Sequence, residues 1–111
     1  MLCFNEETFG PVCPIMSFDD VEDAIRIANE LPYGLASYVW GSDSVQALGV
    51  AERLHTGIVG INDPAPVTCW TPFGGRKQSG WGIEGGAGAL DEYAPPKTYS
   101  IVDSERSAGQ R

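Results

Sequence analysis

The sequence predicts an α/β fold with a small parallel sheet. Short apolar runs, each with the length and composition typical of a strand, alternate with two stretches whose apolar residues recur at helical spacing. The resulting order of strand, helix, strand, helix, strand implies parallel strands joined by right-handed βαβαβ crossovers. With 111 residues, the chain is long enough for one small domain.

The first strand and the first helix are expected ahead of Pro32. Residues 14–18 form a short apolar run. Asp20 is a good N-cap for a helix over residues 20–31, and Pro32 with Gly34 ends that helix. The apolar stripe of this helix consists of Val21, Ala24, Ile25, Ala28 and Leu31.

The next three elements complete the alternation. Residues 35–40 are rich in β-favouring side chains and predict the second strand. Ser42 or Asp43 can cap the second helix, for which Gly57 is a natural C-terminal stop. Residues 57–62 are apolar enough for a third strand buried on both faces. The stripe of the second helix consists of Val45, Leu48, Ala51 and Leu54.

The C-terminal part of the chain begins with a long loop, residues 63–82. It follows the end of a predicted parallel strand, where such sheets usually bind ligands, and loops of this length in compact domains are usually functional. A short helix is expected within residues 87–93 and a terminal strand at residues 97–102. We therefore expect one partial domain over residues 1–102 and a disordered tail over residues 103–111.

Composition and charge argue against several classes of function. The formal net charge is −8, whereas nucleic acids and anionic membranes select basic surfaces. The three cysteines are widely separated and form neither C-x-x-C nor a Cys/His cluster, so no metal site is expected. No apolar run is long enough to span a bilayer, and the N-terminus lacks the basic region of a signal peptide. The expected location is the cytoplasm.

Two motifs carry the functional signal. Residues 72–84 read P-F-G-G-R-K-Q-S-G-W-G-I-E, and glycines this dense indicate a backbone that needs positive φ or approaches something closely. Residues 6–12 read E-E-T-F-G-P-V. In their order and separation, the two motifs resemble elements near the C-terminus of NAD(P)-dependent aldehyde dehydrogenases.

The resemblance implies cofactor contacts for Glu7 and Phe9. In the family, the matching glutamate holds the nicotinamide ribose and the matching phenylalanine packs against the nicotinamide. Two residues apart in an extended segment, these side chains share a side; a carboxylate can accept hydrogen bonds from vicinal hydroxyls, and an aromatic ring can lie against a flat heterocycle. The alternative is a solvated Glu7 and a Phe9 that anchors the core. The cofactor would be NAD or NADP.

The resemblance also implies a substrate wall. In the family, the loop matching residues 63–71 and the phenylalanine matching Phe73 line the aldehyde entry tunnel. Val67, Trp70 and Phe73 are therefore expected to face the aldehyde, although ordinary loop packing is an equal alternative for Val67 and Trp70. Asn62, at the start of the loop, is expected to hold it by hydrogen bonds.

One carboxylate and two lysines match further positions of the family pattern. Glu84 matches a glutamate behind the active site that can assist proton transfer, and the alternative is a carboxylate held by backbone amides at a helix start. Lys77 and Lys97 are expected to form structural pairs rather than to act as bases.

No residue of this chain matches the family's nucleophilic cysteine or its general-base glutamate. Aldehyde oxidation in the family needs a thiolate that attacks the aldehyde and a carboxylate that activates water. Cys3 and Cys13 flank the first motif, and Cys69 alone could approach a bound aldehyde, though it lacks the family's cysteine context. His55 is expected to be a helix-end residue rather than a base. No catalytic residue is therefore predicted, apart from the possible relay at Glu84.

The resemblance covers about residues 1–102 and corresponds to the last fifth or so of a complete aldehyde dehydrogenase. We therefore expect a C-terminal piece of the enzyme, closest to the succinate-semialdehyde-dehydrogenase-like branch and inactive by itself. The expected partners are further copies of the chain or the missing N-terminal part. The alternatives are a non-catalytic oligomerising interaction module and a folded remnant without a function.

Overall fold

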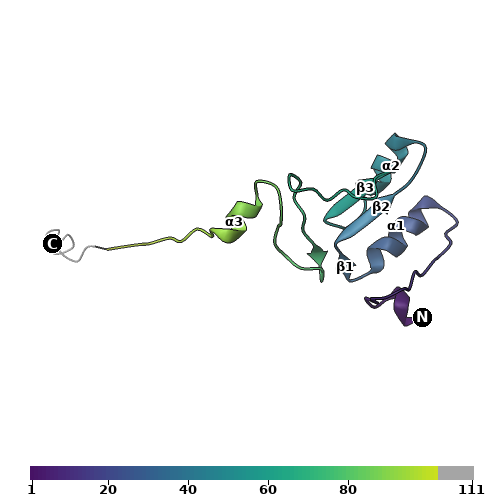
Figure 1. Ribbon diagram of the computed structural model, residues 1–111. Coiled ribbons are helices and arrows are strands. Elements are labelled where there is room, and N and C mark those ends of the chain that lie inside the picture. The colour runs from purple at the N-terminus through teal and green to yellow at the C-terminus, as the bar shows by residue number, and fades with distance from the viewer. Residues whose placement is uncertain (103–111) are drawn as a thin grey trace, which may run out of the picture.

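A computed structural model describes residues 1–102 of the chain. Its elements are a 3₁₀ turn η1 (Leu2–Phe4), α1 (Val21–Glu30), β1 (Tyr33–Gly34), β2 (Ala36–Val39), α2 (Ser44–Ala51), β3 (Ile58–Ile61), β4 (Arg76–Lys77) and α3 (Ala89–Tyr93). The predicted α/β class is confirmed. Figure 1 shows a packed body that contains α1, α2 and the strands, and a segment that leaves it through α3.

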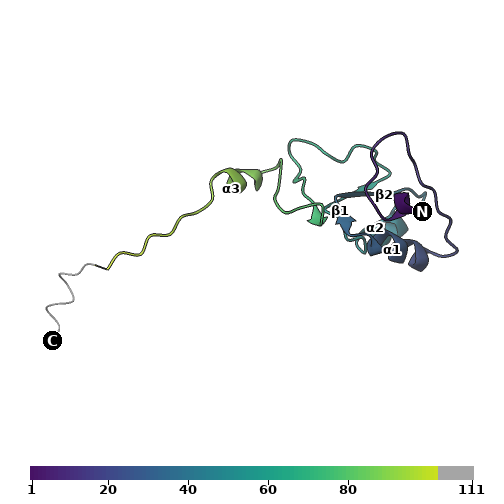
Figure 2. The same cartoon turned by 90° about the horizontal axis from the view of Figure 1, so that it is seen from below.

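A β-α-β unit forms the centre of the body. Strands β2 and β3 pair in parallel, from Ala36 opposite Ile58 to Val39 opposite Ile61, and α2 connects them. Helices α1 and α2 lie on the same side of this sheet (Figure 2). Val39 lines the space between the helices, together with Val21 of α1 and Ala47 of α2.

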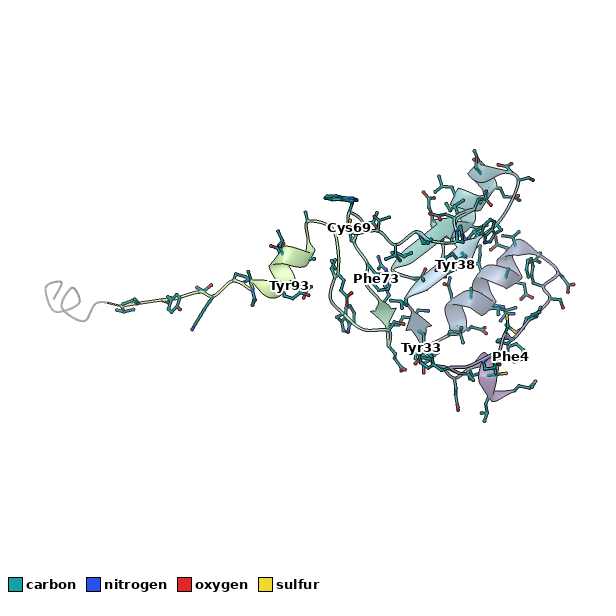
Figure 3. The ribbon with its side chains drawn as sticks, in the orientation of Figure 1. Phe4, Tyr33, Tyr38, Cys69, Phe73 and Tyr93 are labelled. Carbon is teal, nitrogen blue, oxygen red and sulfur yellow. The ribbon has the colours of Figure 1, made fainter. Side chains whose placement is uncertain are left out.

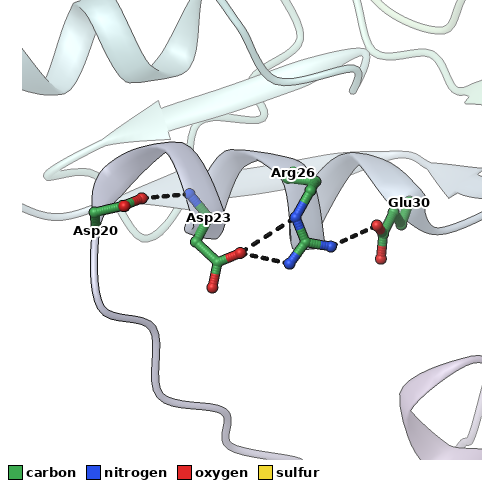
Figure 4. A network of polar contacts seen from close by, with 4 residues as sticks. All are labelled: Asp20, Asp23, Arg26 and Glu30. Atoms are coloured by element: carbon green, nitrogen blue, oxygen red, sulfur yellow. Dashed lines mark hydrogen bonds and ion pairs between the residues drawn. The ribbon is translucent and has the colours of Figure 1, made fainter.

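Helix α1 begins at a side-chain cap. The Asp20 carboxylate accepts a hydrogen bond of 2.7 Å from the Asp23 backbone N–H, as the sequence predicts. On the exposed face, Arg26 bridges Asp23 and Glu30, with Nη1 donating to Glu30 Oε1 at 2.6 Å (Figure 4). The hydrogen bonds to Asp23 and then to Glu30 raise the pKa of Arg26 above its ordinary value. These pairs one turn apart support the helix locally.

The structure decides between the two predicted N-caps of α2, Ser42 and Asp43. Asp43, not Ser42, holds the first turn, because its Oδ1 accepts from the N–H groups of Val45 at 2.9 Å and Gln46 at 3.1 Å. The helix ends at Ala51 rather than near Gly57. Gly57 instead precedes β3, where a Cβ atom would overlap the carbonyl oxygen of Gly74. The glycine is needed there for close approach of two backbones, not for a helix stop.

Side chains of α1 contact the segment that follows α2. The Asn29 amide donates to the Arg53 carbonyl at 2.8 Å and accepts from the His55 N–H at 2.8 Å. Arg53 also pairs with Glu22, with Nη1 donating to Oε1 at 2.6 Å. The segment after α2 is thus joined to the end of α1 by the Asn29 amide and to the first turn of α1 by the Glu22 ion pair.

Two of the predicted strands do not form within the described residues. Residues 14–18 have no regular structure, and Ile15 is 85% exposed. Residues 97–102 likewise pair with no strand, and Tyr99 and Ile101 are exposed. A strand is stable only when its backbone groups have a partner, and neither segment has one here. The parallel sheet therefore contains one crossover instead of the predicted βαβαβ series.

A second, antiparallel ladder was not predicted. Tyr33 pairs with Lys77 and Gly34 with Arg76, so that β4 joins β1 at the end of α1. The prediction of a terminal strand at residues 97–102 is therefore wrong. The tail predicted at residues 103–111 lies outside the described residues. Among the described residues, no helix has the length and apolar character needed to cross a membrane.

Little of the apolar surface is covered. Within residues 1–102 the buried apolar side chains are Ile25, Ala47 and Ala51. The radius of gyration is 22.1 Å, whereas a compact chain of this length has about 13 Å. The extents of 76 × 31 × 28 Å agree with the extended segment after α3 in Figure 1.

Candidate functional site

The glycine-dense motif folds as a hairpin. Phe73 and Glu84 face each other across it, and each backbone N–H donates to the other residue's carbonyl oxygen at 2.7 Å. Gly74 follows Phe73 and lies against Gly57 at the start of β3. The hairpin base therefore places a candidate substrate-wall residue and a candidate relay residue side by side, next to the parallel sheet.

The tip of the hairpin is fastened to the end of α1 and to β1. The Lys77 ammonium group donates to the carbonyl oxygens of Asn29 at 2.8 Å and Leu31 at 2.9 Å. The Gln78 N–H donates to the Pro32 carbonyl at 2.9 Å. Ser79 Oγ accepts from the Gly34 N–H at 2.9 Å. The expected structural role of Lys77 is thus contact with backbone carbonyls rather than an ion pair.

The loop that leads to the hairpin is organised by two threonines. Thr71 Oγ1 accepts from the Thr68 N–H at 3.0 Å, and Thr68 Oγ1 accepts from the Trp70 N–H at 3.3 Å. The Gly86 N–H donates to the Cys69 carbonyl at 3.0 Å and ties this turn to the segment after the hairpin. Sequence reasoning missed this network, although two threonines three residues apart are a recognisable side-chain turn signal.

Asn62 has a positive φ of 52° and a structural role, as expected, but it holds a different segment. Its side chain accepts from the Gly41 N–H and donates to the Gly41 carbonyl, both at 2.9 Å. The amide therefore joins the end of β3 to the turn before α2, not to the following loop.

The three residues proposed as a substrate wall are not gathered on one cavity. Phe73 is half-buried and lines a cavity of about 330 Å³ with Glu84, Trp81 and Tyr93. Val67 is 48% exposed, Trp70 is 85% exposed, and neither lines that cavity. Figure 3 shows Phe73 on the hairpin side of the body and Tyr93 on α3. The structure thus brings Phe73 to Glu84, and leaves Val67 and Trp70 on the surface.

The two residues proposed as cofactor contacts do not line the same cavity. Glu7 lines a cavity of about 570 Å³ with hydroxyl-bearing Ser37, Thr56 and Ser79. Phe9 does not line it and is 89% exposed, so Phe9 does not anchor the core in the described structure.

The lining of this cavity limits what it can hold. Phe4 of η1 and Tyr33 of β1, both labelled in Figure 3, also line it. Glu6 and Glu7 bring carboxylates, and none of the described lining residues is a lysine or arginine. Carboxylates and hydroxyls can bind a sugar's hydroxyl groups, whereas a diphosphate requires cationic or N–H donors. The lining therefore offers groups that suit the hydroxyls of a ribose, whereas none of the described lining residues supplies a cation for a pyrophosphate.

The remaining candidates are the three cysteines and Lys97. The thiols are free; Cys13 and Cys69 are exposed, and half-buried Cys3 lines the same cavity as Glu7. Lys97 lies over the Tyr99 ring, 5.1 Å from its centroid, outside the body. Within the described part of the chain, no group of three or more His, Cys, Asp or Glu side chains could hold a metal ion.

Comparison with known proteins identifies the evolutionary relationship. Residues 1–99 match the sequence model described as "Aldehyde dehydrogenase family". The match covers most of the chain, including both motifs and the β-α-β unit. This chain belongs to the aldehyde dehydrogenase family.

Among its curated relatives in the family are several named succinate-semialdehyde dehydrogenase. The mitochondrial enzyme of Rattus norvegicus is 48% identical over 97 residues, which are 87% of this chain and 18% of that enzyme. The mitochondrial enzyme of Homo sapiens is 50% identical over 93 residues, 84% of this chain and 17% of the enzyme. An NADP(+)-named enzyme of Saccharomyces cerevisiae is 44% identical over 87% of this chain and 20% of its own length.

Solved structures of the family share the fold of this piece. Betaine aldehyde dehydrogenase from Staphylococcus aureus, in complex with NAD+, has a TM-score of 0.78 and 45% identity, over 80% of this chain and 18% of that one. Salicylaldehyde dehydrogenase from Pseudomonas putida G7, complexed with salicylaldehyde, has a TM-score of 0.76 and 39% identity, over 80% and 19%. The chain spans about one fifth of the length of these relatives.

Proposed function

We propose that this chain is the C-terminal part of an aldehyde dehydrogenase, in which an aldehyde is oxidised to a carboxylic acid and hydride passes to NAD or NADP. The observation that carries the proposal is the family match across residues 1–99, which includes both motifs while spanning about one fifth of the relatives' length. In the complete enzyme, this part supplies nicotinamide-ribose contacts and one side of the aldehyde tunnel.

The cofactor role is assigned to Glu7 and Phe9. Support comes from the cavity that Glu7 shares with Ser37, Thr56 and Ser79, because its acceptors and hydroxyls suit a ribose. Phe9 is exposed and free to meet a nicotinamide bound against other polypeptide. Since cations for the pyrophosphate are missing from this cavity, the isolated chain should bind NAD more weakly than about millimolar.

The substrate role is assigned to Val67, Trp70 and Phe73, with Glu84 as a proton relay in the complete enzyme. Support comes from the hairpin pairing of Phe73 with Glu84 and from the exposure of Val67 and Trp70, whose apolar surface is available to other polypeptide or to an aldehyde. The names of the curated relatives favour succinate semialdehyde or a similar aldehyde.

The isolated chain is expected to be inactive. The test is an NADH-production assay with the pure chain, succinate semialdehyde and NAD, with Cys69→Ser as a matched variant. The expected result is no saturable turnover in either protein, because no residue of the sequence matches the family's nucleophilic cysteine or its general-base glutamate. Saturable NADH production that disappears in Cys69→Ser would overturn the proposal of an incomplete enzyme.

A second candidate function is an oligomerising interaction module. Tyr99, Ile101 and Val102 form an exposed, β-favouring segment, and both edges of the β2–β3 ladder are short and open. Such a segment can pair with a second copy. Light scattering should give a mass of at least two chains, reduced by deletion of residues 97–111; a monomer mass at every concentration argues against this function.

The matched residues do not determine the cellular location of a complete enzyme. The cytoplasm stays our prediction for this chain, while the rat and human relatives carry the word mitochondrial in their names. A tagged full-length parent expressed in cells would separate the two compartments by fractionation.

A further inference from the structure

The hairpin of residues 72–84 touches the body at two places, and these differ in kind. At its base, Gly74 lies against Gly57 through backbone contact alone. At its tip, a charged side chain reaches across: the Lys77 ammonium group donates two hydrogen bonds to carbonyl oxygens at the C-terminal end of α1. The tip therefore carries the specific, charge-assisted part of the attachment.

The acceptors of Lys77 lie at the C-terminal end of α1. The carbonyl oxygens of Asn29 and Leu31 belong to the last turn of α1 and its cap residue, where helix carbonyls have no partner within the helix. No basic side chain lies in the last turn of α1 itself. Lys77, 46 residues beyond Leu31, supplies the cation that the negative end of the helix dipole favours.

The backbone at Lys77 has a strained conformation. Its φ is +56°, a left-handed conformation that costs free energy for a residue with a Cβ and suits glycine better. The neighbouring motif positions are already rich in glycine, yet a lysine occupies this one. A strained backbone persists where surrounding contacts outweigh its cost, and the two ammonium hydrogen bonds are such contacts.

We propose that Lys77 is a positioning residue that latches the hairpin onto the end of α1 and thereby fixes Phe73 and Glu84 relative to the parallel sheet. The latch itself depends only on the contacts described above. Its consequence for the aldehyde tunnel rests on the proposed function, since Phe73 and Glu84 are assigned there. The C-terminus of α1, which is far from the tunnel loop in sequence, then determines the position of Phe73 in the proposed tunnel wall.

The experiment measures amide hydrogen exchange and proton chemical shifts by NMR on the ¹⁵N-labelled full chain, without cofactor or aldehyde. The variants are Lys77→Met, which keeps the stem and removes the donors, and Lys77→Gly, which also relieves the positive φ. Lys97→Met is the matched control, because it removes a lysine that lies outside the body.

In both Lys77 variants, exchange at the Phe73 and Glu84 amides should accelerate about tenfold or more, and their proton shifts should move upfield as the 2.7 Å hydrogen bonds lengthen. The Ile58 and Asn62 amides of the parallel ladder should keep their protection, as should every amide in Lys97→Met. These readouts report on the latch even if the assigned enzyme function is wrong.

Two outcomes would overturn the proposal. If Lys77→Gly keeps or increases the protection of Phe73 and Glu84, the position serves backbone geometry and not the ammonium contact. If Lys77→Met accelerates exchange by the same factor at Phe73, Glu84, Ile58 and Asn62, Lys77 is a general stabilising residue that positions nothing in particular.

Discussion

Single residues determine where backbone segments of this chain can meet. Gly57 and Gly49 make a useful pair, because both are glycines in or beside regular structure. A Cβ on Gly57 would overlap the carbonyl of Gly74, whereas a Cβ on Gly49, inside α2, would meet nothing within 4 Å. The same substitution should therefore have opposite effects at the two positions.

Gly57→Ala is expected to lower the free energy of unfolding by about 1–3 kcal/mol, since the hairpin base must move away from β3. Gly49→Ala is expected to raise it by roughly 0.5–1 kcal/mol, because alanine is the better helix former and has space. Urea unfolding followed by far-UV circular dichroism measures both. Equal losses in the two variants would contradict the close approach of Gly57 and Gly74.

Asp43 is the residue that decides where α2 begins. Its carboxylate accepts from two backbone N–H groups in the first turn. Asp43→Ala should cost about 0.5–2 kcal/mol of unfolding free energy, and Asp43→Asn should keep most of it, because the amide oxygen also caps well. Ser42→Ala is the control and should change little; a larger loss there than in Asp43→Ala would assign the cap to Ser42.

At the scale of elements, side-chain signals predicted the starts of α1 and α2 well, whereas the predicted end of α2 was wrong. Aspartates ahead of apolar-periodic runs placed the starts of α1 and α2 to within a residue. Strands were harder, because a strand depends on a partner that sequence does not display. Residues 14–18 have the composition of a strand and no neighbour to pair with, whereas β4 has little strand character and pairs because Lys77, Gln78 and Ser79 dock beside β1.

The candidate site was also predictable from the sequence only in part. Motif resemblance selected Glu7, Phe73 and Glu84, and the structure puts Phe73 beside Glu84 and places Glu7 in a cavity lined with hydroxyls. Motif resemblance could not predict how the hairpin is attached to α1, because Lys77 donates to backbone carbonyls, and these have no sequence signature. Phe9 and Trp70 are exposed in the described structure, and their proposed contacts with cofactor and substrate stay predictions.

The ion pair between Glu22 of α1 and Arg53 after α2 should make the stability of the fold depend on pH. The hydrogen bond from Arg53 holds the pKa of Glu22 below its ordinary value of 4.5. A carboxyl group whose pKa is lowered by folding stabilises the fold above its unfolded-state pKa, and that contribution is lost as the pH falls through the folded-state value. Glu22→Gln should thus be less stable than the parent at pH 7, with the difference vanishing below the lowered pKa.

The measurement is the urea midpoint of parent and Glu22→Gln from neutral to acidic pH, repeated at high salt, which should also shrink the difference because the pair is exposed. Glu52→Gln is the control, since Glu52 follows α2 and makes no ion pair in the described structure. Removing its charge from a helix C-terminus should leave stability equal or higher. A Glu22→Gln difference that persists unchanged into acid would contradict the ion pair.

At the scale of the whole molecule, the chain exposes far more surface than a folded monomer of its size. Its accessible surface is 9278 Å², whereas a compact protein of this length exposes roughly 6,000 Å². The excess exceeds the roughly 1,600 Å² buried in a standard protein–protein interface. Much of it is apolar, from large side chains such as Phe9, Trp70, Trp81 and Ile101. This much uncovered apolar surface favours contact with other polypeptide.

The exposed surface predicts how the isolated chain will unfold. The denaturant slope scales with the surface that unfolding newly exposes, and small compact proteins give about 1–3 kcal/mol/M in urea. Because few side chains are buried here, the slope should fall below about 1 kcal/mol/M, and the folded chain should bind the apolar-surface dye ANS. Truncation after Pro96 should leave the slope unchanged, since residues 97–102 are exposed and pair with no strand. A steep transition without dye binding would mean that the chain covers its apolar surface by itself, and the case for a larger enzyme or a second copy as its cover would fail.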